Sequence, residues 1–208
     1  MDVPSITQTS MTLLEQMRGV VNERAWHEFM RRYSPMILAF CKRLGLSDSD
    51  ALDALQETVI AVSEDFRTMD APFDRSKGRF KSWLRGVARN KALSINRKSK
   101  PRRGFVAESN DEPGADLAAL PDVAGQDEIE SLWEIEWRRN LLRLAMEQIT
   151  GEFEPATVHA FILLVVDGWP VERVAAMMHR RPNAIYIAKH RILSRLREVV
   201  DELVEAEG

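Results

Sequence analysis

Apolar residues recur along almost the whole chain at intervals of three and four, which is the period of an amphipathic helix. Alternation at period two between turn dipeptides, which is typical of β-strands, does not recur. The pattern therefore predicts an all-α protein. The expected helices cover residues 11–21, 24–44, 48–67, 78–98, 126–150, 155–167, 171–178 and 182–204.

One segment, residues 101–125, interrupts this pattern. It contains three prolines, three glycines, several acidic residues and few apolar ones, which is the composition of a linker. We therefore expect two small helical domains, at residues 1–100 and 137–208. Residues 101–136 are expected to form an acidic linker between them.

The composition fits such an architecture and excludes other classes. A chain of 208 residues has room for one large or two small domains, and 45% hydrophobic with 29% charged residues is too apolar for a disordered tail. No stretch reaches the roughly 18 uninterrupted apolar residues of a membrane span, and the N-terminus does not resemble a signal peptide. We expect a cytoplasmic protein without membrane insertion. Its single cysteine, Cys41, excludes an intrachain disulfide.

Charge is distributed in blocks of one sign. Residues 75–103 hold twelve Lys/Arg and no acid, and residues 104–136 hold ten Asp/Glu and no base. Residues 173–197 carry seven Lys/Arg without an acid, whereas 45–74 carry eight acids and one arginine. Because a solvated surface ordinarily mixes its signs, these blocks indicate at least two kinds of partner, and the basic blocks suit polyanions.

The helix expected at 48–67 has two contrasting faces. One apolar stripe is expected to be buried, and it consists of Leu52, Leu55, Val59, Val62 and Phe66. The opposite face holds Asp50, Asp53, Gln56, Glu57, Ile60 and Glu64. The acids are either simply solvated or form a docking face for a basic partner, and the charge pattern alone leaves both interpretations open.

The helix expected at 78–98 combines an aromatic ring with cations. Phe80, Leu84, Val87 and Ile95 form the expected core stripe. Aromatic rings stack on unpaired bases and Lys/Arg neutralise phosphates, so the segment suits melted nucleic acid. The candidate contacts are Arg79, Lys81, Trp83, Arg85, Arg89, Asn90, Lys91, Arg97 and Lys98. The alternative is that Trp83 belongs to the core and the cations are solvated.

The C-terminal part has the spacing of a helix-turn-helix. A short helix ends near Met178, and Pro182 stands where a second helix can begin. The stripe expected to be buried in the second helix is Ile185, Ala188, Ile192, Leu196 and Val199.

The opposite face of this second helix carries groups that read a major groove. The residues placed to reach base edges are Asn183, Tyr186, Ile187, His190 and Arg191. Those better placed for phosphates are Arg180, Arg181, Arg195 and Arg197. The alternative is a helical hairpin that docks on protein.

No arrangement of catalytic residues is evident. The four histidines, His27, His159, His179 and His190, lack metal-ligand spacing, and there is no glycine-rich phosphate loop. We therefore expect neither an enzyme nor a cofactor or metal site.

Several of these segments together resemble bacterial sigma factors of the extracytoplasmic-function (ECF) class, which keep only the second and fourth conserved regions of larger sigma factors. The resemblance covers about 24–103 and 137–200. It is carried by FMRRYSPMILAFCKRL with DALDALQETV, and by GRFKSWLRGVARNKALSINRK. The family's promoter-melting motif is matched by Phe80, Trp83, Leu84, Ala88, Arg89 and Asn90.

The resemblance implies partners and roles. Asp50, Asp53, Gln56 and Glu57 would bind the coiled coil of the largest subunit of core RNA polymerase. The next basic segment would capture the melted -10 strand of promoter DNA, and the helix-turn-helix would read the -35 duplex. The acidic linker would occupy the RNA exit path, and an anti-sigma factor is an optional further partner.

The chain departs from the family in its recognition helix. PNAIYIAKHRILSRL stands where Gly-Thr-Val and an Arg-Ala-Arg run are usual, and His179 replaces the usual glycine of the turn. The resemblance therefore implies a left-handed backbone with positive φ at His179. The competing hypothesis is a helix-turn-helix regulator with an unrelated N-terminal sensor domain. An adaptor that binds only protein would require both basic blocks to be accidental.

Overall fold

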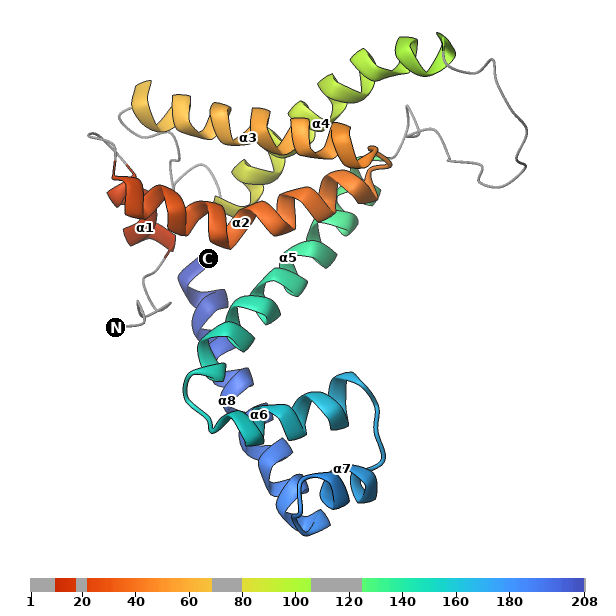
Figure 1. Ribbon diagram of the computed structural model, residues 1–208. Coiled ribbons are helices and arrows are strands. Elements are labelled where there is room, and N and C mark those ends of the chain that lie inside the picture. The colour runs from red at the N-terminus through yellow and green to blue at the C-terminus, as the bar shows by residue number, and fades with distance from the viewer. Residues whose placement is uncertain (1–9, 18–21, 69–79, 106–124, 208) are drawn as a thin grey trace. The chain divides into compact units, whose positions relative to one another are not determined.

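The computed structural model describes residues 10–17, 22–68, 80–105 and 125–207, and the regular secondary structure in these ranges is entirely helical (Figure 1). The first four helices are α1 (Ser10–Gln16), α2 (Glu23–Arg43), α3 (Asp48–Thr68) and α4 (Phe80–Phe105). The others are α5 (Gln126–Thr150), α6 (Pro155–Phe161), the π-helical turn η1 (Ile162–Val166), α7 (Val171–Met177) and α8 (Pro182–Glu207). The all-α prediction is confirmed for these residues.

Contacts between residues divide the chain into two compact units. One contains Ser10–Asn140 and the other contains Leu141–Ala206, so the division falls inside α5. Each unit is described by itself below. No helix in the described ranges is long and apolar enough to cross a membrane.

The first unit is built on α2, α3 and α4, and small side chains bring α3 and α4 together. Ala51, Ala54 and Thr58 of α3 are fully buried, as are Ala88 and Ala92 of α4. Residues of this size let two helix backbones approach closely. On α2, the core is instead formed by the rings of Phe29, Tyr33 and Phe40 with Ile37 between them.

This small-residue contact corrects the stripe predicted for α3. Val62 and Phe66 are buried as expected, but Leu55 and Val59 are only half-buried and Leu52 is 55% exposed. The helix is rotated so that alanine and threonine, rather than leucine, face the core. On α4, Val87 and Ile95 are likewise half-buried beside the buried Ala88 and Ala92.

The start of α5 was expected to be helical and was also counted in the acidic linker at 101–136, and it packs in the first unit. Trp133 is fully buried, with its ring centroid 4.9 Å from that of Phe40, and Trp137 stacks on Tyr33 at 6.1 Å. Residues 126–136 are thus helical, and their aromatic anchors outweigh their acidic composition. The backbone of α4 also continues helically to Phe105, beyond the predicted end at residue 98.

The second unit is built from the C-terminal half of α5, α6, η1, α7 and α8. Its core cluster consists of Ala160, Leu163, Val171, Val174, Ala175 and Ile185. The π-turn is closed by the Asp167 N–H, which donates to the Ile162 carbonyl at 3.0 Å. Gly168, with φ of 68°, then redirects the chain towards α7.

Candidate nucleic-acid interface

The turn between α7 and α8 has the geometry that the sequence predicts. His179 has φ of 51° and is the one non-glycine residue with positive φ in the described ranges. Its N–H donates to the Ala176 carbonyl at 3.2 Å, and the Arg180 N–H donates to the Ala175 carbonyl at 2.9 Å. This pair of bonds defines a Schellman C-cap, in which glycine usually takes the left-handed position. The predicted break between the two helices and the predicted positive φ of His179 are both confirmed.

Glycine at this position should stabilise the fold. A left-handed backbone costs a residue with a Cβ roughly 1–2 kcal/mol, and glycine's larger unfolded-state entropy offsets part of that gain. We expect His179→Gly to raise the free energy of unfolding by about 0.5–1 kcal/mol, measured by chemical denaturation. Met178→Gly is the matched control, because φ there is −86° and glycine should lower stability. Equal effects of the two variants would contradict the assigned strain.

The recognition face of α8 is open to solvent. Tyr186 is 52% and Ile187 53% exposed, and Asn183 and His190 are also exposed. The opposite stripe is buried at Ile185, Ile192, Leu196 and Val199, with Ala188 half-buried. The side chains expected to contact base edges therefore lie on the solvent-exposed face of α8, and the buried apolar face packs the helix into the second unit.

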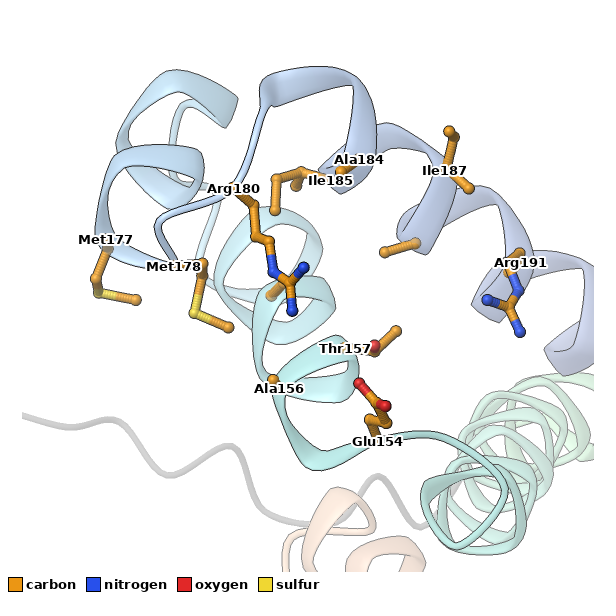
Figure 2. Close-up of a pocket in the computed structure, with 12 residues that line it drawn as sticks. Glu154, Ala156, Thr157, Met177, Met178, Arg180, Ala184, Ile185, Ile187 and Arg191 are labelled. Atoms are coloured by element: carbon orange, nitrogen blue, oxygen red, sulfur yellow. The ribbon is translucent and has the colours of Figure 1, made fainter.

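A cavity of about 470 Å³ lies beside this face, between α6, α7 and the start of α8. Figure 2 shows Glu154, Thr157 and Arg180 directed towards it. Arg191 also lines the cavity, and its guanidinium lies 5.8 Å from the ring centroid of Phe153. At this distance a cation–π contact restrains the Arg191 side chain.

Arg195, which the sequence placed among the phosphate contacts, is held by glutamates. Its guanidinium pairs with Glu152 at 2.7 Å, Glu198 at 3.1 Å and Glu202 at 3.5 Å. The hydrogen bond from Arg195 lowers the pKa of Glu152, and those to Glu152 and Glu198 raise the pKa of Arg195. The neighbouring candidates Arg180, Arg181 and Arg197 are exposed.

On α4, Trp83 has both a packed and an exposed part. Its ring centroid lies 5.9 Å from that of Phe66 and 5.7 Å from that of Phe80, yet the residue is only half-buried. The two phenylalanines therefore orient an indole that solvent can still reach. The sequence left two interpretations of Trp83 open, core packing and a stacking platform. Its ring contacts agree with the first, and its remaining exposure agrees with the second.

The cations predicted along α4 differ in their surroundings. Lys81 pairs with Glu134 and Arg85 with Glu130, each at 2.5 Å, and both glutamates lie on α5. Lys91 is 3.5 Å from Glu57 of α3. The half-buried Arg89 has a buried Nε without a hydrogen-bond partner in the described residues. Asn90, Arg97 and Lys98 are exposed, and Arg79 lies outside the described residues.

The acidic face of α3 forms a continuous exposed strip. We define the docking strip as Leu52, Asp53, Gln56, Glu57 and Ile60, all of which are exposed. Asp50 differs from them because its carboxylate accepts hydrogen bonds from Ser47 at 2.8 Å and Ser99 at 2.7 Å. Ser47 in turn caps the Asp50 N–H at 3.2 Å, so Asp50 helps fix the start of the helix.

Sequence reasoning missed three residues of these surfaces. Leu52 was assigned to the core, although its spacing of four and eight residues from Gln56 and Ile60 places it in their row. Glu130 and Glu134 were treated as linker acids, and no local signal shows that they meet cations of α4. Their separation of four residues, like that of Lys81 and Arg85, is the one available clue.

These features describe a class of protein. A helix-turn-helix with an open recognition face, an aromatic and basic helix, and an acidic strip with exposed apolar residues suit a transcription factor with duplex, single-strand and protein partners. Among the described residues no group of side chains could hold a metal ion. Burial raises the pKa of the Cys41 thiol to about 12, which makes it a poor nucleophile.

Comparison with known proteins gives the family. Residues 29–102 match the model of Sigma-70 region 2. The RNA polymerase sigma factor CarQ of Myxococcus xanthus is 28% identical over 185 residues, covering 86% of this chain and 91% of CarQ. ECF RNA polymerase sigma factor ShbA of Streptomyces griseus subsp. griseus is 26% identical, covering 86% of this chain and 89% of ShbA.

A third relative extends the match almost to the full chain. ECF RNA polymerase sigma factor SigD of Mycobacterium tuberculosis is 28% identical over 210 residues, covering 95% of this chain and 89% of SigD. The chain therefore contains a match to Sigma-70 region 2, and over most of its length it is similar to ECF sigma factors, which are non-enzymatic proteins that direct transcription initiation with RNA polymerase.

Proposed function

We propose that this chain binds core RNA polymerase and selects promoters by reading a -35 duplex with α8 and capturing the melted -10 strand on α4. The observation that carries the proposal is the presence on one chain of two different nucleic-acid surfaces. One is an exposed recognition face, and the other is a half-buried tryptophan on a basic helix. A protein that binds only duplex DNA has no need of the second surface, because the faces of its bases are already stacked on neighbouring base pairs.

The two surfaces are assigned to separate domains. Residues 1–100 form a region 2-like domain, and residues 137–208 form a region 4-like domain that begins within α5. Between them we place the acidic linker at 101–136, which includes the helical start of α5. Acting on promoter DNA, the protein would work in the cytoplasm.

At the -35 element, the contacts divide by chemistry. Asn183, Tyr186, Ile187, His190 and Arg191 reach base edges, and Arg180, Arg181 and Arg197 contact phosphates. Arg195 is assigned a supporting part, since three glutamates already neutralise it. Its ion pairs join α8 to the segment before α6 and so help hold the recognition helix in position.

At the -10 element, Trp83 supplies the stacking platform. Phe66 and Phe80 hold its indole in place, and the exposed Asn90, two helical turns further along α4, offers hydrogen bonds. The cations Arg79, Lys81, Arg85, Arg89, Lys91, Arg97 and Lys98 neutralise the phosphates of the strand.

The docking strip on α3 binds the polymerase. Its acids, Asp53 and Glu57, suit a basic helix of the largest subunit. The exposed Leu52 and Ile60, one at each end of this acidic pair, add apolar contacts to the interface. Asp50 contributes mainly by fixing the helix end. An anti-sigma factor, if this chain has one, would act by covering this strip or the recognition face.

Run-off transcription with core polymerase and genomic fragments tests the proposed function. We expect discrete transcripts that require both the polymerase and this chain. Sequence-specific DNA binding by the chain alone, without any polymerase-dependent transcript, would instead establish a helix-turn-helix regulator. Binding to polymerase without DNA specificity would establish an adaptor.

A further inference from the structure

The cations of the proposed -10 surface are already occupied by a segment of the same chain. Lys81 Nζ lies 2.5 Å from a Glu134 carboxylate oxygen, and Arg85 lies 2.5 Å from Glu130. Within each helix the two partners are four residues apart, and the pairing is crossed, so α4 and α5 run antiparallel here. The two ion pairs form adjacent rungs between the helices.

Aromatic packing holds these rungs in place. Trp133 is fully buried, and Ile129 and Trp137 are almost fully buried on the same face of α5. Lys81 Nζ also lies 5.5 Å from the Trp137 ring centroid. A buried Glu136 adds an ion pair to Arg43 of α2.

This anchoring changes what the ion pairs can do. Isolated surface pairs contribute little because two mobile side chains must be ordered. Here the apolar face already fixes the helix, so Glu130 and Glu134 are presented to the cations at a high effective concentration. A carboxylate offers Lys and Arg the same kind of charge-assisted acceptor as a phosphate oxygen.

We propose that the N-terminal half of α5 is an internal competitor of the promoter strand, in which Glu130 and Glu134 hold the places of two phosphates on Lys81 and Arg85. The inference rests on the proposed -10 function of α4. It implies that the free chain binds single-stranded promoter DNA weakly. A strand gains these two cations only by displacing the glutamates.

The test uses the full chain with Glu130→Gln and Glu134→Gln combined. Its probe is a labelled single-stranded oligonucleotide of the non-template -10 sequence, and binding is followed by fluorescence anisotropy at several salt concentrations. We expect binding about three- to tenfold tighter. The salt dependence should also be steeper by up to about 1.4 in log–log slope, since each phosphate contact on a single strand contributes about 0.7.

Controls separate a local effect from a change in net charge. Asp127→Asn with Glu128→Gln removes the same two charges from exposed positions in the first turn of α5, and neither residue forms an ion pair with α4 among the described contacts. This control should bind the oligonucleotide no more than twofold more tightly. A second variant, Glu130→Ala with Glu134→Ala, should reproduce the gain, and circular dichroism verifies that each variant is folded.

A fourth protein distinguishes failure of the inference from failure of the function. Lys81→Gln with Arg85→Gln should weaken promoter opening by the holoenzyme. If that variant is impaired but removing Glu130 and Glu134 leaves oligonucleotide binding unchanged, the competitor is excluded and the -10 assignment stands. If neither pair of changes has an effect, both the competitor and the -10 roles of Lys81 and Arg85 are wrong. A gain equalled by the Asp127/Glu128 control also overturns the competitor.

Discussion

Replacing Asp53 and Glu57 with lysine should reduce the affinity for core RNA polymerase at least 100-fold. Both side chains are exposed on the docking strip, one helical turn apart, so the change should leave the helix intact. The change turns two attractions into two repulsions. A 100-fold loss of affinity corresponds to about 2.7 kcal/mol, and close charge pairs in interfaces have coupling energies of about 1.5–7 kcal/mol, so the expected loss lies within their range. Affinity is measured by titrating labelled chain with core enzyme.

The matched control is Asp201→Lys with Glu205→Lys on α8. These residues are exposed, have the same four-residue spacing, and change the net charge by the same amount. The control should bind core polymerase within about threefold of the unaltered chain. Equal losses in the two variants would show that net charge, rather than the docking strip, governs the affinity.

The apolar part of the docking strip has a separate signature. Leu52 is 55% exposed, so Leu52→Ser should leave the free energy of unfolding almost unchanged. If the polymerase covers this side chain, affinity should fall about tenfold with the salt dependence retained. Unchanged affinity would remove Leu52 from the interface and leave the acidic residues to account for docking.

The extent of sequence prediction differs between helices and helix faces. The expected helix at 126–150 matches α5. Those expected at 24–44 and 48–67 differ from α2 by one residue at each end and from α3 by one residue at its C-terminal end, because periodicity and capping are local properties. The positive φ of His179 was predicted from the resemblance, because His179 stands where the family usually has the glycine of the turn, and the turn has one left-handed position.

Helix faces were less predictable because they depend on the partner helix. The wheel of α3 favoured Leu52 for the core, yet α3 and α4 are in contact and the fully buried residues on them include Ala51 and Ala54 of α3 and Ala88 and Ala92 of α4, which let the helices approach more closely than leucine would. The amphipathic pattern of a helix shows which face is more hydrophobic, but it does not show which face a neighbouring helix can approach closely. The exposed leucine is the visible result.

Long-range charge pairing was the least predictable feature. The acids of α5 looked like those of a solvated tether, because they end a block, residues 104–136, that contains no cation. Their partners lie far away in the chain, and two tryptophans determine that they meet. Composition therefore described residues 126–136 as acidic, but it could not show that their helix pairs with cations of α4.

The second large effect is expected at Trp83. Trp83→Ala should reduce open-complex formation by roughly 5- to 150-fold, because base–aromatic stacking contributes about 1–3 kcal/mol per base and only a melted strand offers a base face. Binding to core polymerase and to -35 duplex should be preserved. Permanganate reactivity of unpaired thymines in the -10 region measures the opening.

Truncating Trp83 also removes ring contacts with Phe66 and Phe80, so a packing control is required. Phe66→Leu perturbs the same aromatic cluster from its buried side and leaves the exposed indole in place. It should lower stability while opening stays within about threefold of the unaltered chain, provided that the assay temperature lies well below both melting transitions. Full opening by folded Trp83→Ala would identify the ring as core packing. An equal loss of promoter opening in both variants would show that opening depends on the packing of the aromatic cluster. Both changes disturb that packing, but only Trp83→Ala removes the ring on which a base would stack.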